Sequence, residues 1–383
     1  MRVSSLIIGI SLAPSPSNAF TKPSFLKPTF STTSSLYSSS LMPEGGLSPC
    51  VIKIIGVGGG GCNAIDRMME TEVFGVEYWA VNTDAQALGR SKARGANVLN
   101  IGIDVTRGLG AGGDPEIGRL AAEESEADIA AMVSGADMIF VTSGMGGGTG
   151  SGAAPVVAEI AKESGALTVA IVTKPFGFEG RRRMNQATAA IDRLNDATDT
   201  IIVISNNKLL EIIPEGTPLG RSFAVADDIL RQGIIGISEI IMRTGMVNVD
   251  FADIRSIMRD AGSAFIGIGT GSGKTMAEDA AVAAISSPLI DVPIERATGV
   301  VMNIVGSKDM SIHDAYRAAA VIYKTVDEDA NILFGADTDD NMEEGTMSIT
   351  VLTTGFNGGN FDSSNSVSRG GEGTGGMPDF FSP

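Results

Sequence analysis

The chain contains few of the residues from which disulfides, metal centres and histidine-based catalytic sites are built. Its 383 residues include one histidine, His313, and two cysteines, Cys50 and Cys62. These numbers exclude a disulfide framework and a zinc cluster, and a catalytic triad would depend on His313 alone. We expect His313 to be a partly exposed residue of an alanine-rich helix. Cys62 lies in a glycine-rich stretch, which favours a reducing compartment.

Basic residues are scarce as well. The chain has 28 Lys and Arg residues against 45 Asp and Glu residues, for a formal net charge of −17 at pH 7. Such a surface disfavours nucleic acid and anionic membranes as direct partners. The early apolar stretch at residues 3–13 is too short to span a bilayer, so we expect no direct membrane insertion. A hydrophobic content of 43% supports a sizeable core, in one large domain or two.

Acidic residues are absent from residues 1–43. The stretch 3–13 is followed by a small-x-small cleavage pattern ending at Ala19, with Phe20 next, and residues 21–43 contain eleven Ser or Thr residues. This two-part address resembles the plastid-targeting presequences of algae with secondary plastids. It predicts delivery to the plastid (chloroplast) stroma. An ordinary secretory signal is the alternative, and a mitochondrial presequence fits less well because the apolar run lacks spaced arginines.

The most informative stretch is the glycine-rich run at residues 144–152, GMGGGTGSG, in which six of nine residues are glycine. It follows the apolar residues 138–142 and precedes a helical pattern that begins at Ala153. Glycine lets backbone N–H groups approach an anion, and a helix start adds unpaired donors and partial positive charge. The run therefore predicts a loop for a phosphate chain, with a flexible linker as the alternative.

Two further glycine runs have the same setting. The run at 58–61 follows an apolar strand pattern and precedes a helix that we expect to begin at Cys62. The run at 108–113 leads into Asp114, a good helix cap, and a helix expected to reach about residue 134. Three loops around one site suit a nucleoside triphosphate better than a dinucleotide.

Apolar runs elsewhere complete the predicted architecture. Strand patterns at 76–81, 167–172 and 201–204 join those before the glycine runs, for six strands separated by helices. This order predicts an α/β fold with a doubly wound, mostly parallel sheet and a ligand at the carboxyl ends of the strands. A long central helix is predicted over 221–242. The remaining pattern over 263–355 predicts a smaller α+β domain with strands at 264–268, 300–305, 331–334 and 348–352 and helices at 276–285 and 312–326.

Residues 269–275, GTGSGKT, look like a phosphate-binding loop, but the spacing G-x4-G-K-[ST] fails by one residue. We therefore expect a turn there.

Two pairs of charged residues at element boundaries are candidates for chemistry. Glu179 and Arg183 come just after the strand at 167–172, where they suit ribose hydroxyls and phosphate charge, with a solvated ion pair as the alternative. Asp250 and Asp253 lie at a loop-to-helix junction, and paired carboxylates polarise a water or help to hold a cation. The alternative for this second pair is a helix cap and a first-turn acid.

These stretches together resemble the tubulin/FtsZ superfamily, of which GMGGGTGSG is the signature. The region from about 51 to 355 resembles FtsZ, the division GTPase of bacteria and organelles, in the stretches IKIIGVGGGGCN, AVNTDAQAL, GLGAGGDPEIG, TKPFGFEGRRR, VADDILRQGIIGISEII and NVDFADI. FEGRRR and VADDILRQGI are similar to the plastid and cyanobacterial branch.

The resemblance implies GTP binding and hydrolysis coupled to head-to-tail filament assembly. It places phosphate contacts at Gly59, Gly60, Gly61, Cys62 and Asn63 and at Gly146, Gly147, Gly148, Thr149 and Gly150. It also implies that the γ-phosphate is sensed by Ala111, Gly112 and Gly113, that Glu179 and Arg183 contact the ribose and phosphate region, and that guanine is read by Asn206 and Asp227 with Phe223 stacked on the base. Asn248, Asp250 and Asp253 match the family's synergy loop, which enters the nucleotide pocket of the next subunit and positions the attacking water.

The resemblance further implies Mg²⁺ held by phosphates and waters, with K⁺ as a candidate second cation and no protein metal site. It divides the chain into a presequence (1–43), a GTP-binding domain (44–220), a linking helix (221–244), an α+β domain with the synergy loop (245–355) and a disordered tail (356–383). The tail ends in a peptide, residues 377–383, that resembles the family's docking segment for a membrane-anchored division protein but lacks its basic residues. Thr244 replaces a proline that is frequent in the family.

We expect a plastid-division GTPase that assembles into a ring with itself or with a paralogue. A NAD-dependent dehydrogenase is the first alternative, because residues 56–61 match G-x-G-x-x-G and Asp84 ends the next strand. It leaves the runs at 108 and 144 unexplained. A non-catalytic, co-assembling FtsZ paralogue is the second, and the intact Asp250 and Asp253 argue against it.

Overall fold

The structure is a computed structural model that describes residues 50–70, 75–213, 216–242, 247, 249–290 and 292–356. All of these residues belong to one compact unit. The predicted presequence, Asn248, Thr244 and the tail from residue 357 lie outside the described residues.

Six parallel strands form the first part of the sheet, as the alternating strand and helix patterns predict. They run in the order β3-β2-β1-β4-β5-β6, with β1 (Ile52–Val57), β2 (Val76–Asn82), β3 (Asn97–Asn100), β4 (Met138–Gly144), β5 (Leu167–Lys174) and β6 (Thr200–Ser205). The central strands are almost fully buried, because helices cover both faces of a parallel sheet. The order reverses between β1 and β4, and this switch point is where such sheets bind ligands.

Helices cover the two faces of this sheet in separate cores. One core joins alternate strand residues such as Ile54 and Phe140 to α1 (Gly58–Met68) and α9 (Leu219–Met242). The other joins the intervening residues, such as Ile55 and Val141, to α4 (Pro115–Glu124), α5 (Glu126–Val133), α6 (Gly148–Glu163) and α7 (Arg181–Ala197). The predicted doubly wound α/β fold is confirmed.

Shorter elements complete this half of the molecule. They are α2 (Ala85–Ala93), α3 (Ile103–Thr106), the 3-10 turn η1 (Gly177–Glu179) and α8 (Asn206–Ile212). The single helix predicted up to residue 134 is wrong, because it is divided at Ser125 into α4 and α5. Ser125 leaves helical geometry, and its buried hydroxyl accepts the Gly102 N–H at 3.0 Å.

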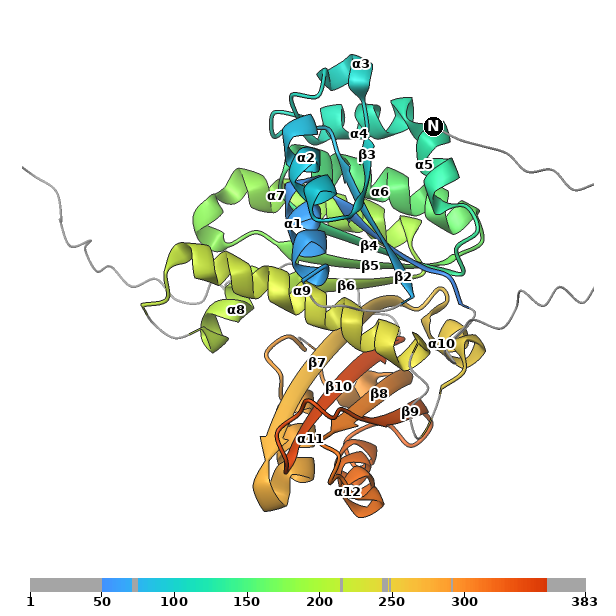
Figure 1. Cartoon of the computed structure of the whole chain (residues 1–383), viewed down its shortest axis with the longest axis vertical. Coiled ribbons are helices and arrows are strands. Elements are labelled where there is room, and N and C mark those ends of the chain that lie inside the picture. Colours follow the sequence, from blue (N-terminus) through green and yellow to red (C-terminus); the bar gives the residue numbers. More distant parts are fainter. Residues whose placement is uncertain are drawn as a thin grey trace, which may run out of the picture. The chain divides into compact units, whose positions relative to one another are not determined.

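A second set of strands follows α9. After α10 (Phe251–Met258) come β7 (Gly262–Ser272), the 3-10 turn η2 (Gly273–Thr275), α11 (Met276–Ile285), the 3-10 turn η3 (Ile294–Arg296), β8 (Gly299–Gly306), α12 (Ile312–Tyr323), β9 (Asn331–Thr338) and β10 (Thr346–Thr354). The strands are ordered β7-β10-β8-β9, and β10 is antiparallel to both of its neighbours. Figure 1 shows α9 lying between these strands and β4 to β6.

The strand β7 joins the two halves, because its first residues also pair in parallel with β6 over three positions. The turn predicted over 269–275 is confirmed only at Gly273–Thr275, since residues 269–272 continue β7. A Cβ on Gly271 would lie 2.1 Å from the Met276 carbonyl oxygen, so this glycine allows β7 to pack closely on α11. His313 is exposed on α12, as predicted. No helix in the described ranges has the length and hydropathy needed to cross a membrane.

Candidate active site

The three glycine runs meet at the carboxyl ends of β1 and β4. A Cβ on Gly58 would lie 2.7 Å from the Gly150 nitrogen, and a Cβ on Gly148 would lie 2.9 Å from the Asp114 nitrogen. The run at 58–61 can therefore contact the run at 144–152 only because Gly58 lacks a side chain. The run at 144–152 likewise contacts the end of the run at 108–113 only because Gly148 lacks one. The result places the starts of α1 and α6 side by side at the switch point, with their unpaired N–H groups at one edge of the sheet.

The helices α1 and α6 begin earlier than predicted, at Gly58 rather than Cys62 and at Gly148 rather than Ala153. Thr149 and Gly150 are consequently first-turn residues whose N–H groups have no partner within the helix. Four glycines of the three runs face open space, because an added Cβ would meet no protein atom within 4 Å; they are Gly59, Gly112, Gly113 and Gly147. The loops thus surround a volume that a ligand can fill.

Other predicted phosphate contacts are already engaged within the protein. The Gly146 N–H donates to the Ser151 hydroxyl at 2.7 Å, so it is not available to a phosphate. The Thr149 hydroxyl lies 2.7 Å from the Thr83 hydroxyl, and both residues are buried. Thr83 and Ser151 hold the signature loop in shape, and the sequence analysis missed both of them. The Ala111 side chain is buried against the start of α6.

Cys62 lies in α1 with its thiol directed into the core. The Sγ atom accepts from the Asn82 amide at 3.7 Å, and burial raises the pKa of the thiol to about 12. A buried, protonated thiol is unreactive. The Cys62 N–H is the fifth in a helix that begins at Gly58, so it donates within the helix, and the predicted phosphate contact at Cys62 is not available in this arrangement. Gly61 packs against the Thr142 carbonyl oxygen, whereas Asn63 and Gly59 are exposed and Gly60 is partly exposed.

Asp84 follows the end of β2, but its carboxylate is engaged within the protein and is not free for the ribose contact of the dehydrogenase alternative. Its carboxylate caps α2, accepting the N–H groups of Gln86 at 2.8 Å and Ala87 at 3.3 Å. A carboxylate engaged in this way is a structural helix cap.

Glu179, in η1, and Arg183, in the first turn of α7, form an ion pair with each other, which was the alternative to the predicted ribose and phosphate contacts. The Arg183 guanidinium donates to Glu179 Oε2 at 2.5 Å, and Glu179 Oε1 accepts the Phe176 N–H at 2.9 Å. The Glu179 side chain is 14% exposed and that of Arg183 is 58% exposed. A Cβ on Gly146 would lie 2.8 Å from the Arg183 carbonyl oxygen, so the first turn of α7 rests on the signature loop. The arginine is therefore anchored beside the phosphate loops with its charge accessible.

Asn206 offers a buried acceptor atom, and Asp227 offers a partly buried carboxylate. Asn206 begins α8, and its buried Oδ1 has no hydrogen-bond partner among the described residues. The Asp227 carboxylate, on α9, lies 3.1 Å from the Arg67 guanidinium, and its side chain is 18% exposed. Burial raises the pKa of Asp227, while Arg67 opposes this shift. A cavity of about 530 Å³ is lined by Asp227 and by Asn63, which lies in the middle of α1.

Phe223 belongs to a cluster of three aromatic rings, of which only Phe223 was predicted from the sequence as a site residue. It contacts Phe176 edge to face with ring centroids 5.2 Å apart, and Phe176 stacks on Phe178 at 5.2 Å. Phe223 is 38% exposed and Phe178 is 62% exposed, so both present ring surface to solvent. The Pro-Phe-Gly-Phe segment after β5 was the available signal for Phe176 and Phe178.

An unpaired buried amide oxygen and a partly buried carboxylate beside exposed aromatic faces fit a planar base with N–H donors. Guanine has such donors at its ring N1 and exocyclic amine. The open glycine loops next to them fit a phosphate chain. No group of three or more His, Cys, Asp or Glu side chains within the described part of the chain is arranged to hold a metal ion.

Asp250 and Asp253 lie at the opposite edge of the sheet from the glycine loops. Asp250 immediately precedes α10 and its side chain makes no capping hydrogen bond, while Asp253 lies in the first turn; both are exposed. The helix α10 is attached to the amino ends of β5 and β6, since Arg255 donates to the Gly165 carbonyl oxygen and Thr200 to that of Met258. The seven residues of β4 alone separate the two edges by about 20 Å. The acidic pair is therefore not part of the nucleotide pocket of its own chain.

Phosphate-binding glycine loops at the switch point of a doubly wound sheet, followed by a long helix and a second set of strands in which β10 is antiparallel to its neighbours, define a nucleotide-binding protein with tubulin-like architecture. Residues 51–214 match the model of the Tubulin/FtsZ family GTPase domain, and residues 262–357 match that of the FtsZ family C-terminal domain. The chain belongs to the FtsZ family and is a GTPase of the kind that forms filaments in cell division.

Solved structures agree with this placement. The empty FtsZ dimer of M. jannaschii is 45% identical, with a TM-score of 0.76, over 80% of this chain and 88% of that one. A point mutant of M. jannaschii FtsZ is 44% identical, with a TM-score of 0.76, over 80% of this chain and 91% of that one. CetZ2 from Haloferax volcanii, in a GTPγS-bound protofilament, shares the fold at 21% identity and a TM-score of 0.66, over 79% of this chain and 92% of that one. The dehydrogenase alternative is wrong, because the family is that of a GTPase.

Proposed function

We propose that this chain hydrolyses GTP at a site completed only when two subunits associate head to tail. The observation that carries the proposal is the separation of the glycine loops and the pair Asp250 and Asp253 at opposite edges of one sheet. A heterologous interface that brings one edge of a subunit against the opposite edge of the next places both parts on one nucleotide and also propagates as a filament.

Different groups bind the phosphates, the guanine and the attacking water within this shared site. The first-turn N–H groups of α1 and α6 and the exposed Arg183 stabilise the phosphate charge, while Asn206, Asp227 and Phe223 hold the guanine. Asp250 and Asp253 of the neighbouring subunit, together with Asn248, orient a water for attack on the γ-phosphorus. The Pγ–O bond to the β-phosphate then breaks, so that GDP and phosphate are released. Mg²⁺ held by the phosphates and waters neutralises the charge that develops, and K⁺ is a candidate second cation.

The test is GTP turnover per subunit at rising concentrations of residues 44–383 with Mg²⁺ and K⁺, measured alongside pelletable polymer. Turnover near zero below a threshold, followed by a rise together with polymer, is expected for a shared site. Turnover per subunit that does not depend on concentration would contradict the proposal, since a self-contained site needs no neighbour.

The cellular role that we propose is division of the plastid, as part of a ring anchored through the C-terminal tail. The support is the two-part presequence over residues 1–43 and the peptide at 377–383. A fluorescent fusion to residues 1–43 should accumulate in the stroma of a complex plastid. Secretion of that fusion would contradict the plastid assignment and leave the GTPase assignment intact. Deletion of residues 377–383 should abolish membrane recruitment but not polymer formation.

A further inference from the structure

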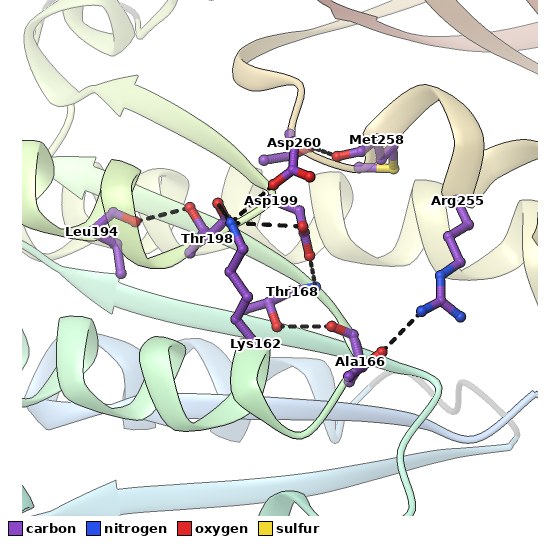
Figure 2. A network of polar contacts seen from close by, with 11 residues as sticks. Lys162, Ala166, Thr168, Leu194, Thr198, Asp199, Arg255, Met258 and Asp260 are labelled. Atoms are coloured by element: carbon purple, nitrogen blue, oxygen red, sulfur yellow. Dashed lines mark hydrogen bonds and ion pairs between the residues drawn. The ribbon is translucent and has the colours of Figure 1, made fainter.

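A polar network links the carboxyl end of α6 to the turn after α10 (Figure 2). Lys162, in the last turn of α6, donates from Nζ to the Thr198 carbonyl oxygen at 2.9 Å and to Asp260 Oδ1 at 3.1 Å. Its ammonium group also lies 3.8 Å from the buried Asp199 carboxylate. One cation therefore connects α6 to the start of β6 and to the turn that follows α10.

A second contact runs in the reverse direction. Arg255, on α10 itself, donates to the carbonyl oxygen of Gly165, which follows α6, at 2.9 Å. Each helix thus sends one basic side chain to the turn at the end of the other. A cavity of about 170 Å³ lies between these contacts, lined by both side chains and by Asp199 and Asp260. Buried Ile254, Ile257 and Met258 pack α10 into the core, and the polar contacts add to this packing at the carboxyl end of the helix.

Asp260 is held in a conformation that costs energy. It has a φ of +51°, which is uncommon for any residue other than glycine, although Asp and Asn tolerate it better than most. It lies in the short turn between the end of α10 at Met258 and the start of β7 at Gly262. The bond from Lys162 ties this turn, which connects α10 to β7, to the end of α6.

The helix α6 has the GTPase signature at its other end. It begins at Gly148, beside the phosphate loops, and its 16 residues extend about 24 Å to Lys162. A single helix therefore has one end in the nucleotide pocket and the other end bonded to the element that presents Asp250 and Asp253. Lys162 touches neither the pocket nor the acidic pair.

We propose that Lys162, through Asp260, is a positioning residue for hydrolysis: it holds α10 in the orientation from which Asp250 and Asp253 reach the nucleotide of the next subunit. The inference rests on the proposed function, since it assumes that the acidic pair acts across the interface. Because small displacements of catalytic groups have large effects on rate, loss of this contact lowers turnover without removing any group that binds GTP.

The test compares Lys162→Met, which keeps the aliphatic stem, Lys162→Arg, which keeps the charge, and Asp260→Asn, which tolerates the positive φ. Lys324→Met, at the exposed end of α12, is the matched control. Three quantities are measured: GTP affinity below the assembly threshold, polymer mass, and turnover per polymerised subunit. Lys162→Met and Asp260→Asn should lower turnover per polymerised subunit by about tenfold. GTP affinity and polymer mass should stay within about twofold of the wild type. Lys162→Arg and the control should match the wild type.

Unchanged turnover per polymerised subunit in Lys162→Met or Asp260→Asn would overturn the inference. A loss of total GTP turnover that only matches the loss of polymer mass would also overturn the inference, because that result indicates a structural role only. Should Lys162→Met fail to fold, the exposed Asp260→Asn decides the question. Asp250→Ala in the same assay keeps the two proposals distinguishable: polymers of Asp250→Ala that hydrolyse GTP contradict the shared site, whereas their inactivity beside active Lys162→Met polymers contradicts only the positioning role.

Discussion

Buried acceptor atoms dominate the part of the site that we propose for the guanine base. Asn206 Oδ1 has no partner among the described residues, and Asp227 has Arg67 on one carboxylate oxygen, Oδ2. A buried polar atom without a partner costs free energy, which a ligand with matching donors offsets. Such atoms discriminate strongly between bases. A base without the matching donors leaves the buried acceptors unpaired, and the free-energy cost of their burial is then not offset.

Asp227→Asn should weaken GTP binding by about 10- to 100-fold, because an amide replaces one of the two carboxylate acceptors with a donor. The measurement is nucleotide affinity below the assembly threshold, where polymer does not contribute. The matched control is Asp228→Asn on the same helix, whose carboxylate accepts from Arg231 at 2.7 Å. Equal losses in the two variants would refute the assigned role of Asp227.

The affinity for GTP should also depend on pH through Asp227. Burial raises the pKa of this carboxyl above its ordinary value of 3.8, against the opposing effect of Arg67. Only the ionised form accepts both guanine donors, so affinity is full above the raised pKa and falls as the pH decreases through it. The phosphates titrate as well, and therefore the ratio of wild-type to Asp227→Asn affinity is the quantity to follow. That ratio should fall towards one on acidification, and a constant ratio would contradict the prediction.

At the scale of helices and strands, the sequence pattern located most strands and the long central helix, but it gave no range for β3, α2 or α7 and misplaced several ends. Apolar periodicity sufficed for the order of strands, because both faces of the sheet are buried. It failed at the starts of α1 and α6, where glycine has poor helix propensity and yet is required by close contacts such as that of Gly58 with Gly150. It also failed at Ser125, whose bond to Gly102 reaches 23 residues back.

The candidate site was predictable where a local motif carries it and not where distant residues meet. The glycine runs, Glu179 and Arg183 are local. Arg67 meets Asp227 across 160 residues, and Lys162 meets Asp260 across 98. No periodicity or spacing encodes such pairs.

Gly271→Ala tests the interpretation of residues 269–275 as packing rather than phosphate binding. An added Cβ would lie 2.1 Å from the Met276 carbonyl oxygen, so β7 and α11 must separate, at a cost of about 1–3 kcal/mol in unfolding free energy. Affinity for GTP should not change. The control is Gly89→Ala in α2, where a Cβ meets nothing within 4 Å and helix propensity favours alanine. Denaturant unfolding of both variants checks the prediction, and a loss of GTP affinity in Gly271→Ala at full stability would contradict it.

At the scale of the whole molecule, the two halves of the site face away from each other. The pocket opens at the carboxyl edge of the parallel strands, and α10 is attached to the amino edge by Thr200 and Arg255. Under the proposed shared site, one subunit alone does not bring both parts to one nucleotide. The formal charge of −17 makes subunits repel, so cations should favour association at low ionic strength.

Complementation between two inactive variants follows from this arrangement. Asp250→Asn keeps an intact pocket and lacks the catalytic acid, whereas Asp227→Asn keeps the acid and has a weakened pocket. At a GTP concentration that saturates only the intact pocket, each alone should be nearly inactive. In an equal mixture, about a quarter of the interfaces in a random filament join an intact pocket to an intact acidic pair. Turnover should therefore recover to about a quarter of the wild-type value. Mixtures that pellet as copolymer but stay inactive would show that pocket and acidic pair must belong to one chain, against the geometry of the sheet.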